Sequence, residues 1–235
     1  MIKEKLAEIN YKIRNAEKRS GRKDGSVKLM AVSKFHPSDA IIQAIEAGQF
    51  LFGENRVQEA NEKFPSIFES YPETELHIIG NLQSNKVKNA VKISSCIQSV
   101  DRVDLLSVIE KNAANLNKNI KVLFEIHTAE DTKSGFESLD DLKIALDGFC
   151  QGKYPHLQAA GFMTMAPFTD DEKQIRNAFI KARTIAEKLK SDYHEFDLSE
   201  LSMGMSGDFE IAIEEGSTLV RVGTAIFGER DYSKK

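Results

Sequence analysis

The chain has 235 residues, of which 41% are hydrophobic, a length that suffices for one large domain or two small ones. Its 32 basic and 36 acidic residues are well mixed and give a net charge of −4, so neither a nucleic-acid nor an anionic-membrane partner is expected. The two cysteines, Cys96 and Cys150, lie on unrelated segments without metal-ligand spacing. We therefore expect no disulfide and no metal site, and a cytoplasmic location. The first residues lack a signal-peptide core, and no segment has the length and apolarity of a membrane span.

An amphipathic helix is predicted over residues 2–18, where apolar side chains recur at intervals of three and four. Short apolar runs then alternate with helical patterns along the rest of the chain. Strands are predicted at 27–33, 50–52, 76–79, 96–100, 120–126, 157–161, 197–202 and 219–222. Helices are predicted over 37–48, 56–69, 85–91, 103–116, 139–148, 170–189 and 207–215, and a capping box of Thr169 and Glu172 is expected to open the longest.

Eight strands that alternate with helices predict an α/β fold, a (β/α)₈ TIM barrel formed as a single domain over residues 1–235. Only seven residues follow Gly228, too few for an eighth outer helix, so we expect the extra helix 2–18 to take that place. An open, doubly wound sheet is the alternative. It ranks second because no strand leads into a GxGxxG turn and no linker divides the chain.

A phosphate-binding site is predicted in residues 201–228, at the last two strand-to-loop turns. Ser206 and Gly207 stand where the helix 207–215 is expected to begin, so Ser206 is expected to cap that helix. Gly223 and Thr224 directly follow the eighth strand. In a barrel of this type, the turns after strands seven and eight are a frequent phosphate site.

Lys34 is expected to be a functional amine, because it ends the first strand beside the eighth strand, which carries Arg221. Desolvation and a neighbouring cation favour the neutral, nucleophilic amine that forms a Schiff base. The implied ligand is an aldehyde that also carries a phosphate. Pyridoxal 5′-phosphate meets both demands, and so does a sugar phosphate bound as an aldolase substrate.

Seven short motifs are spread over about residues 28–228. They are AVSK (31–34), FGENRVQE (52–59), HIIGNLQSNK (77–86), KSGF (133–136), GFMTM (161–165), LSMGMS (201–206) and RVGTAIFG (221–228). Together they closely resemble the motifs of the pyridoxal phosphate homeostasis proteins, the YggS/PROSC family. The resemblance implies the fold of the alanine racemase barrel domain, which is fold type III among proteins that use this coenzyme.

The resemblance also implies roles for particular residues. Lys34 would form the internal aldimine, and Arg221 would face the pyridine nitrogen. The phosphate would lie on Ser206 together with Gly223 and Thr224. Asn55 and the turn around Met203 would line the ring pocket.

The same residues argue against strong catalysis. A guanidinium only donates hydrogen bonds, so Arg221 would leave the ring nitrogen unprotonated and weaken the coenzyme as an electron sink. A racemase of this fold takes its second acid/base, a tyrosine, from an additional β-domain of a partner subunit, and this chain has no residues left for such a domain. The tyrosines lie away from the predicted strand ends, at positions 11, 71, 154, 193 and 232.

We therefore expect a monomeric pyridoxal phosphate homeostasis protein that is not an enzyme, with enzymes that lack their coenzyme as possible recipients. A low-activity amino-acid racemase and an aldolase that uses Lys34 without a cofactor remain the alternatives.

The remaining candidate residues are histidines, a lysine and methionines. His77 is expected to be a buried core residue, whereas His127 at a strand end is either a ligand contact or a rim residue. Lys133 either reaches the cofactor or is solvated, and the solvated position is favoured. Three histidines are expected on the surface: His36, His156 and His194. Four methionines are expected to pack beneath a flat ring rather than to bind a soft metal: Met163, Met165, Met203 and Met205.

Overall fold

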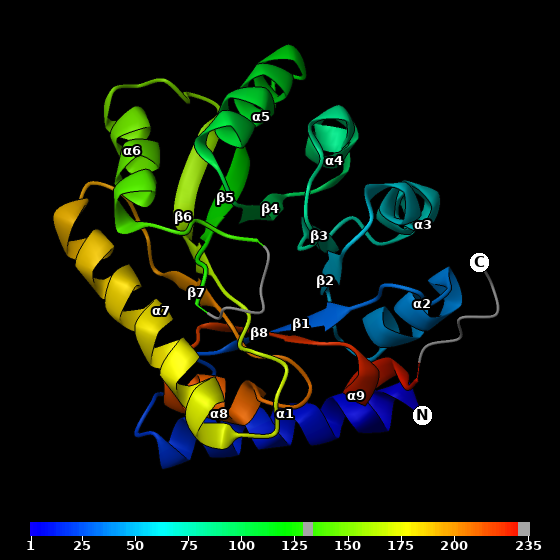
Figure 1. Ribbon diagram of the computed structural model, residues 1–235. Helices are drawn as coiled ribbons and strands as arrows, with labels where there is room; N and C mark the ends of the chain where they lie inside the picture. Colours follow the sequence, from blue (N-terminus) through cyan, green and yellow to red (C-terminus); the bar gives the residue numbers. More distant parts are fainter. Residues whose placement is uncertain (129–133, 230–235) are drawn as a thin grey trace.

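Eight parallel strands pair in chain order and close into a barrel in the computed structural model, which describes residues 1–128 and 134–229 (Figure 1). β8 pairs with β1, with Met30 opposite Arg221 and Ala31 opposite Val222, and this pairing closes the ring. The strands are β1 (Lys28–Val32), β2 (Leu51–Glu54), β3 (Glu75–Ile78), β4 (Cys96–Val100), β5 (Ile120–Glu125), β6 (Leu157–Met163), β7 (Glu200–Ser202) and β8 (Leu219–Val222). The predicted eight-stranded barrel is confirmed.

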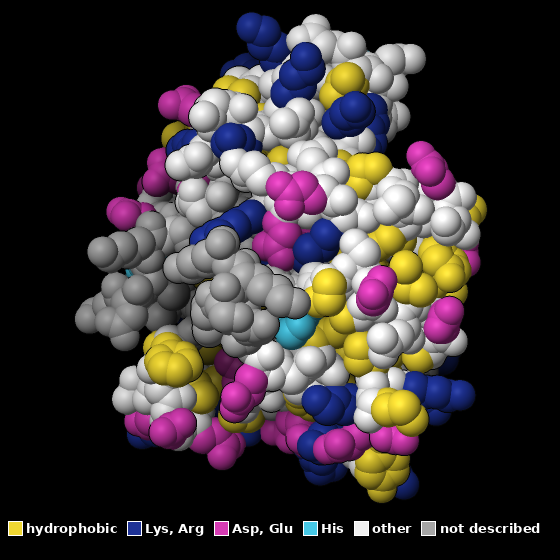
Figure 2. All heavy atoms as spheres, turned by 90° about the vertical axis from the view of Figure 1, so that its right-hand side faces the viewer, with side chains coloured by type: hydrophobic (Ala, Val, Ile, Leu, Met, Phe, Trp, Pro, Cys, Tyr) yellow, Lys and Arg dark blue, Asp and Glu magenta, His cyan; other side chains and the backbone are white. Residues whose placement is uncertain are grey.

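Helical segments follow the strands and surround the barrel (Figure 1). They are α2 (Ser38–Glu46), α3 (Val57–Ser70), the short turn η1 (Ser84–Lys86) with α4 (Val87–Ile93), α5 (Val103–Asn115), α6 (Leu139–Cys150), α7 (Glu172–Asp192), α8 (Phe209–Glu214) and α9 (Thr224–Phe227). In the described part of the chain, no helix combines the length and the apolarity that crossing a membrane requires. Acidic and basic side chains both occur across the face that carries α2 and α3 (Figure 2).

The N-terminal helix α1 (Ile2–Arg19) lies across the outside of the barrel, in contact with α8 and α9 (Figure 1). Leu6, Ile9 and Ile13 are buried in this contact. The buried carboxylate of Glu17 accepts the backbone N–H of Val27 at 2.7 Å and so ties α1 to the chain that enters β1. The expectation that this helix stands in for the missing eighth outer helix is confirmed, since α9 is only four residues long.

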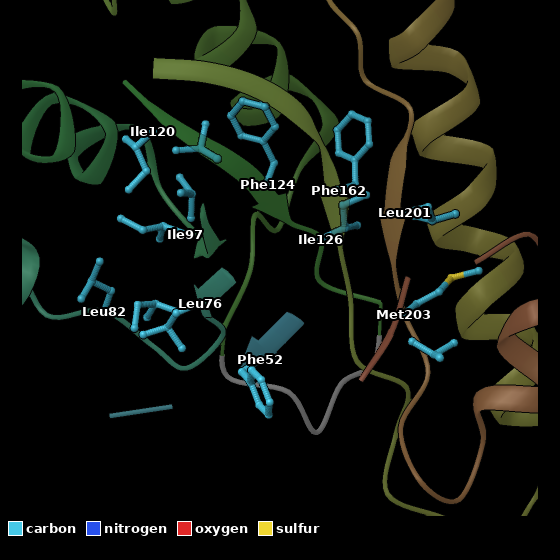
Figure 3. Packing of buried hydrophobic residues seen from close by; sticks show 14 of the residues in the cluster. Phe52, Leu76, Leu82, Ile97, Ile120, Phe124, Ile126, Phe162, Leu201 and Met203 are labelled. Atoms are coloured by element: carbon cyan, nitrogen blue, oxygen red, sulfur yellow. The ribbon is translucent and has the colours of Figure 1, made fainter. Parts of the chain in front are cut away.

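Apolar side chains on the outer faces of the strands form the core between the barrel and its helices (Figure 3). Phe52, Leu76, Ile97, Phe124 and Phe162 belong to this layer, because alternate residues of a strand point to opposite faces. A smaller apolar cluster is separate from it. Its members are Cys96, Leu123, Ala160 and Met163.

A chain of hydrogen bonds crosses the interior of the barrel from β3 to β8. The Gln98 amide donates to His77 Nδ1 at 2.8 Å, and the Ser202 hydroxyl donates to Gln98 Oε1 at 2.7 Å. Since β4 and β7 are not neighbours in the sheet, the bond between Gln98 and Ser202 spans the interior. Arg221 then donates to Ser202 Oγ at 2.8 Å. The prediction that His77 is a hydrogen-bonded core residue is confirmed, and burial lowers the pKa of His77 to about 3.

Two predicted helix starts are wrong. The predicted capping box fails because α7 begins after Asp171, whose carboxylate accepts the N–H groups of Lys173 and Gln174. The Thr169 hydroxyl instead accepts the N–H of Asp171. Helix α8 begins at Phe209 rather than at Gly207, because the preceding residues form a turn.

Replacing Ile9 with alanine should lower the free energy of unfolding by about 2–5 kcal/mol, because removing a side chain that is buried between α1 and the barrel leaves a cavity. Tyr11→Ala is the matched control on the same helix, since Tyr11 is 67% exposed and Ile9 only 3%. Urea unfolding of both variants is the measurement. Equal stabilities of Ile9→Ala and the wild-type protein would contradict the conclusion that α1 stabilises the barrel by packing against it.

Candidate functional site

A cavity of about 400 Å³ opens at the carboxyl ends of the strands, and six of the seven predicted site residues line it. A volume in this range is typical of small-molecule sites. The six residues are Lys34, Asn55, Ser206, Arg221, Gly223 and Thr224.

Lys34 lies in a turn just beyond β1, two residues after the strand ends at Val32, rather than within the strand as predicted. The turn is closed by the N–H of His36, which donates to the Ser33 carbonyl at 3.1 Å. Phe35 has a φ of 67°, in the left-handed region, which costs a non-glycine residue about 1–2 kcal/mol. The backbone around Lys34 is therefore held in an unusual conformation at the cavity wall.

The two C-terminal turns lie side by side at the cavity. Ser206 does not cap α8 as predicted. Its hydroxyl accepts the N–H of Ala225 at 3.5 Å, and this bond links the turn after β7 to the turn after β8. Asp208 takes the capping place at the start of α8, and its carboxylate accepts the N–H of Met205. Within the described residues, the backbone N–H groups of Ser206 and Thr224 have no protein acceptor, so both can bind an anion.

Glycines allow these turns to pack closely. Gly204 has a φ of 98°, and a Cβ there would lie 2.6 Å from the Cβ of Ala212. Gly223 lies against β1, where a Cβ would stand 3.1 Å from the Val32 carbonyl oxygen. Gly204 therefore lets the turn after β7 pack against α8, and Gly223 lets the turn after β8 pack against the first strand.

Arg221 is buried at the base of the cavity and is fixed by three hydrogen bonds. One terminal nitrogen donates to the Ser202 carbonyl at 2.7 Å and to its hydroxyl at 2.8 Å, and the other donates to the Thr164 carbonyl at 2.8 Å. Burial lowers the pKa of Arg221 to about 10, so the guanidinium keeps its charge at neutral pH. The carboxyls of Asp208 and Glu125 stabilise this charge, and burial raises the pKa of each of them.

Asn55 reaches the cavity because the loop after β2 packs against Gly80. A Cβ at Gly80 would lie 2.5 Å from the Asn55 carbonyl oxygen, so only glycine permits this approach. Met203, in contrast, is completely buried in the core and does not line the cavity (Figure 3). Three other methionines line it in its place: Met163, Met165 and Met205.

Two of the histidines expected on the surface are only partly exposed. His36 lines the cavity and stacks on Phe227, with ring centroids 5.0 Å apart. His156 is half-buried, and its Nδ1 lies 2.7 Å from Glu110 Oε1. His194 is exposed as expected. His127 is half-buried beside the Ser134 carbonyl and away from the cavity lining, whereas Lys133 lies outside the described residues.

The sequence reasoning missed the outer wall of the cavity, which the loop between β6 and α7 provides. Ala166, Pro167 and Phe168 line the cavity there, and the Phe168 side chain is fully exposed at its rim. Asp208 was missed as well. The loop has no periodicity to reveal its position, and the only available signal was its place after a strand end.

The family described as "Alanine racemase, N-terminal domain" matches residues 5–231. A pyridoxal phosphate homeostasis protein from Pasteurella multocida is 39% identical over 234 residues, which cover 99% of both chains. This chain belongs to the family of the pyridoxal phosphate homeostasis proteins.

Other members of the family are similarly close. The pyridoxal phosphate homeostasis protein of Escherichia coli K12 is 39% identical over 239 residues, with 100% of this chain and 99% of that protein covered. Among solved structures, PipY of Synechococcus elongatus with PLP bound has a TM-score of 0.85 at 37% identity, covering 97% of this chain and all of PipY. Alanine racemase from Corynebacterium glutamicum shares the fold alone, with a TM-score of 0.65 at 18% identity over 97% of this chain and 62% of that one.

Proposed function

We propose that this chain binds pyridoxal 5′-phosphate through Lys34 and acts in intracellular vitamin B6 homeostasis without being an enzyme. The observation that carries the proposal is the convergence of Lys34, two adjacent turns with anion-binding amides, and buried Arg221 on one cavity. PLP is bound in the structure of the similar PipY, which supports the same ligand here.

The residues present fit the coenzyme. The Ser206 hydroxyl and the amides of the turns at Gly223 and Thr224 would hold its phosphate, and Arg221 would face its ring nitrogen. Asn55 and the cavity methionines would lie along the ring. When bound, the coenzyme supplies an aldehyde, with which a lysine amine forms a carbon–nitrogen double bond while water leaves.

The cavity favours storage or delivery over catalysis. Arg221 donates to Ser202 and Thr164, and a guanidinium accepts no hydrogen bond, so Arg221 cannot stabilise a protonated ring nitrogen by accepting its N–H. No tyrosine of the described residues lines the cavity, and Tyr232 lies outside them. Lys34 alone could serve one face of an amino-acid substrate, and a low-activity racemase is therefore the second candidate.

We also propose a domain structure, an oligomeric state and partners for this protein. A single coenzyme-binding barrel domain over residues 1–235 would act as a cytoplasmic monomer. Coenzyme-free enzymes that need pyridoxal phosphate would be its recipients. The small number of cysteines supports a reducing cytoplasm, and the packing of α1 in place of an eighth outer helix supports one barrel domain.

Lys34→Ala should abolish the absorption band that pyridoxal phosphate gives when it is linked to the protein, because the linking amine is removed. Lys88→Ala, on the exposed face of α4, is the control and should keep the band. Absorption spectra with added coenzyme are the measurement. A wild-type protein that gains no band would contradict the proposal and favour an aldolase for sugar phosphates.

Ser206→Ala should weaken coenzyme binding by about 1–3 kcal/mol, the range for loss of a hydrogen bond to a charged group. Ser107→Ala, on an exposed position of α5, should leave binding unchanged. A binding titration of both variants tests the assignment. An unchanged affinity of Ser206→Ala would show that the phosphate lies elsewhere.

Deuterium exchange at Cα of alanine and of serine separates the two candidate functions. A protein that only carries the coenzyme should show no exchange beyond that caused by free pyridoxal phosphate in the same buffer. Lys34→Ala serves as the background protein, because it lacks the amine proposed to act as a base. Rapid exchange by the wild-type protein would establish the racemase-like activity instead.

A further inference from the structure

The turn that carries Lys34 is gripped from outside the barrel by side chains of α3. The N–H of Phe35 donates to the Glu59 carboxylate at 2.5 Å, and Lys63 Nζ donates to the Ser33 carbonyl at 3.0 Å. These contacts fall on main-chain atoms immediately before and after Lys34. They fix the backbone from which the lysine side chain extends.

Lys63 connects the two sides of this grip. Its ammonium group pairs with the Glu59 carboxylate and, at 3.0 Å, with Glu54 Oε1, which also accepts the Ser33 hydroxyl at 2.7 Å. The side chain of Lys63 is 11% exposed, that of Glu59 18% and that of Glu54 0%. Ion pairs so shielded from water hold their geometry more firmly than pairs on the surface.

Glu59 is a second carboxylate that pairs with Lys63, besides Glu54. Burial raises the pKa of Glu54 to about 7, and among the described residues its Oε2 has no hydrogen-bond partner. Near neutral pH the Glu54 carboxyl is therefore only partly ionised. The pair of Glu59 and Lys63 maintains the grip in either state of Glu54.

The grip also holds a conformation that the chain does not favour by itself. Phe35 has a positive φ of 67°, and the guanidinium of Arg56 lies 5.4 Å from the centroid of its ring. Arg56 directly precedes α3, and Glu59 and Lys63 lie in the first half of that helix. One helix therefore restrains both the backbone and the side chain of the residue after Lys34.

We propose that Glu59 and Lys63 are positioning residues that hold the 33–35 turn so that the Lys34 amine meets the coenzyme aldehyde. The inference rests on the proposed function, since it assigns a purpose to the Lys34 turn. Glu59 and Lys63 do not line the cavity, and they act through the backbone of the turn. The covalent linkage should therefore depend on them, and the phosphate turns should not.

A comparison of two ligands distinguishes a positioning role of Glu59 and Lys63 from a general effect on the stability of the protein. Pyridoxal 5′-phosphate binds through its phosphate and its aldehyde, whereas pyridoxine 5′-phosphate carries the same phosphate and an alcohol in place of the aldehyde. We expect Glu59→Ala and Lys63→Met to weaken pyridoxal phosphate binding and to slow the appearance of its linked absorption band, each by about tenfold. The affinity for pyridoxine phosphate should stay within about twofold of wild type.

Glu59→Gln provides a conservative rescue, because its amide oxygen can still accept the N–H of Phe35 while the charge opposite Lys63 is lost. Glu59→Gln should lose less affinity for pyridoxal phosphate than Glu59→Ala. Glu62→Ala removes a carboxylate from an exposed position of the same helix and should behave as wild type with both ligands. If Lys63→Met fails to fold, the two Glu59 variants still decide the question.

The outcomes distinguish the two claims. A wild-type protein without the linked band would overturn the proposed function itself. A wild-type band together with unchanged Glu59 variants, or with equal losses for both ligands, would overturn only the positioning role. A selective loss of pyridoxal phosphate linkage, with partial rescue by Glu59→Gln, would support it.

Discussion

The pairing of β1 with β8 is the constraint on which the site depends. It sets Met30 opposite Arg221 and Ala31 opposite Val222, and thereby places the start and the end of the barrel side by side. The turn after β1 then presents Lys34 to the same cavity as the turns that carry Ser206 and Gly223. An open sheet would separate these segments, so closure of the barrel creates the site.

Two sets of polar contacts, one on each side of the sheet, fix the positions of Arg221 and of the turn that carries Lys34. Inside the barrel, Arg221 is fixed by Ser202 and Thr164, and the chain of bonds continues through Gln98 to neutral His77. Outside it, α3 restrains the turn that carries the lysine. Buried polar groups are costly unless they are fully paired, and here their pairing orients the groups that face the cavity.

Much of this arrangement could be predicted from the sequence, and the errors fall in the turns. Periodicity revealed the strands, and strand order alone placed Lys34 near Arg221. Met203 was assigned to the pocket because a sequence motif does not show which way a turn points, and the positive φ of Gly204 directs Met205 to the cavity instead. Glu59 and Lys63 are spaced like an ordinary exposed ion pair on a helix, so only the packed structure shows that they grip the 33–35 turn.

The central claim is that the Lys34 amine holds the coenzyme aldehyde beside the phosphate turns. Borohydride reduction of the protein with pyridoxal phosphate makes the linkage permanent, and digestion followed by mass spectrometry locates it. The account predicts one modified peptide, labelled at Lys34. A label on another lysine, or one spread over the exposed lysines, would contradict it.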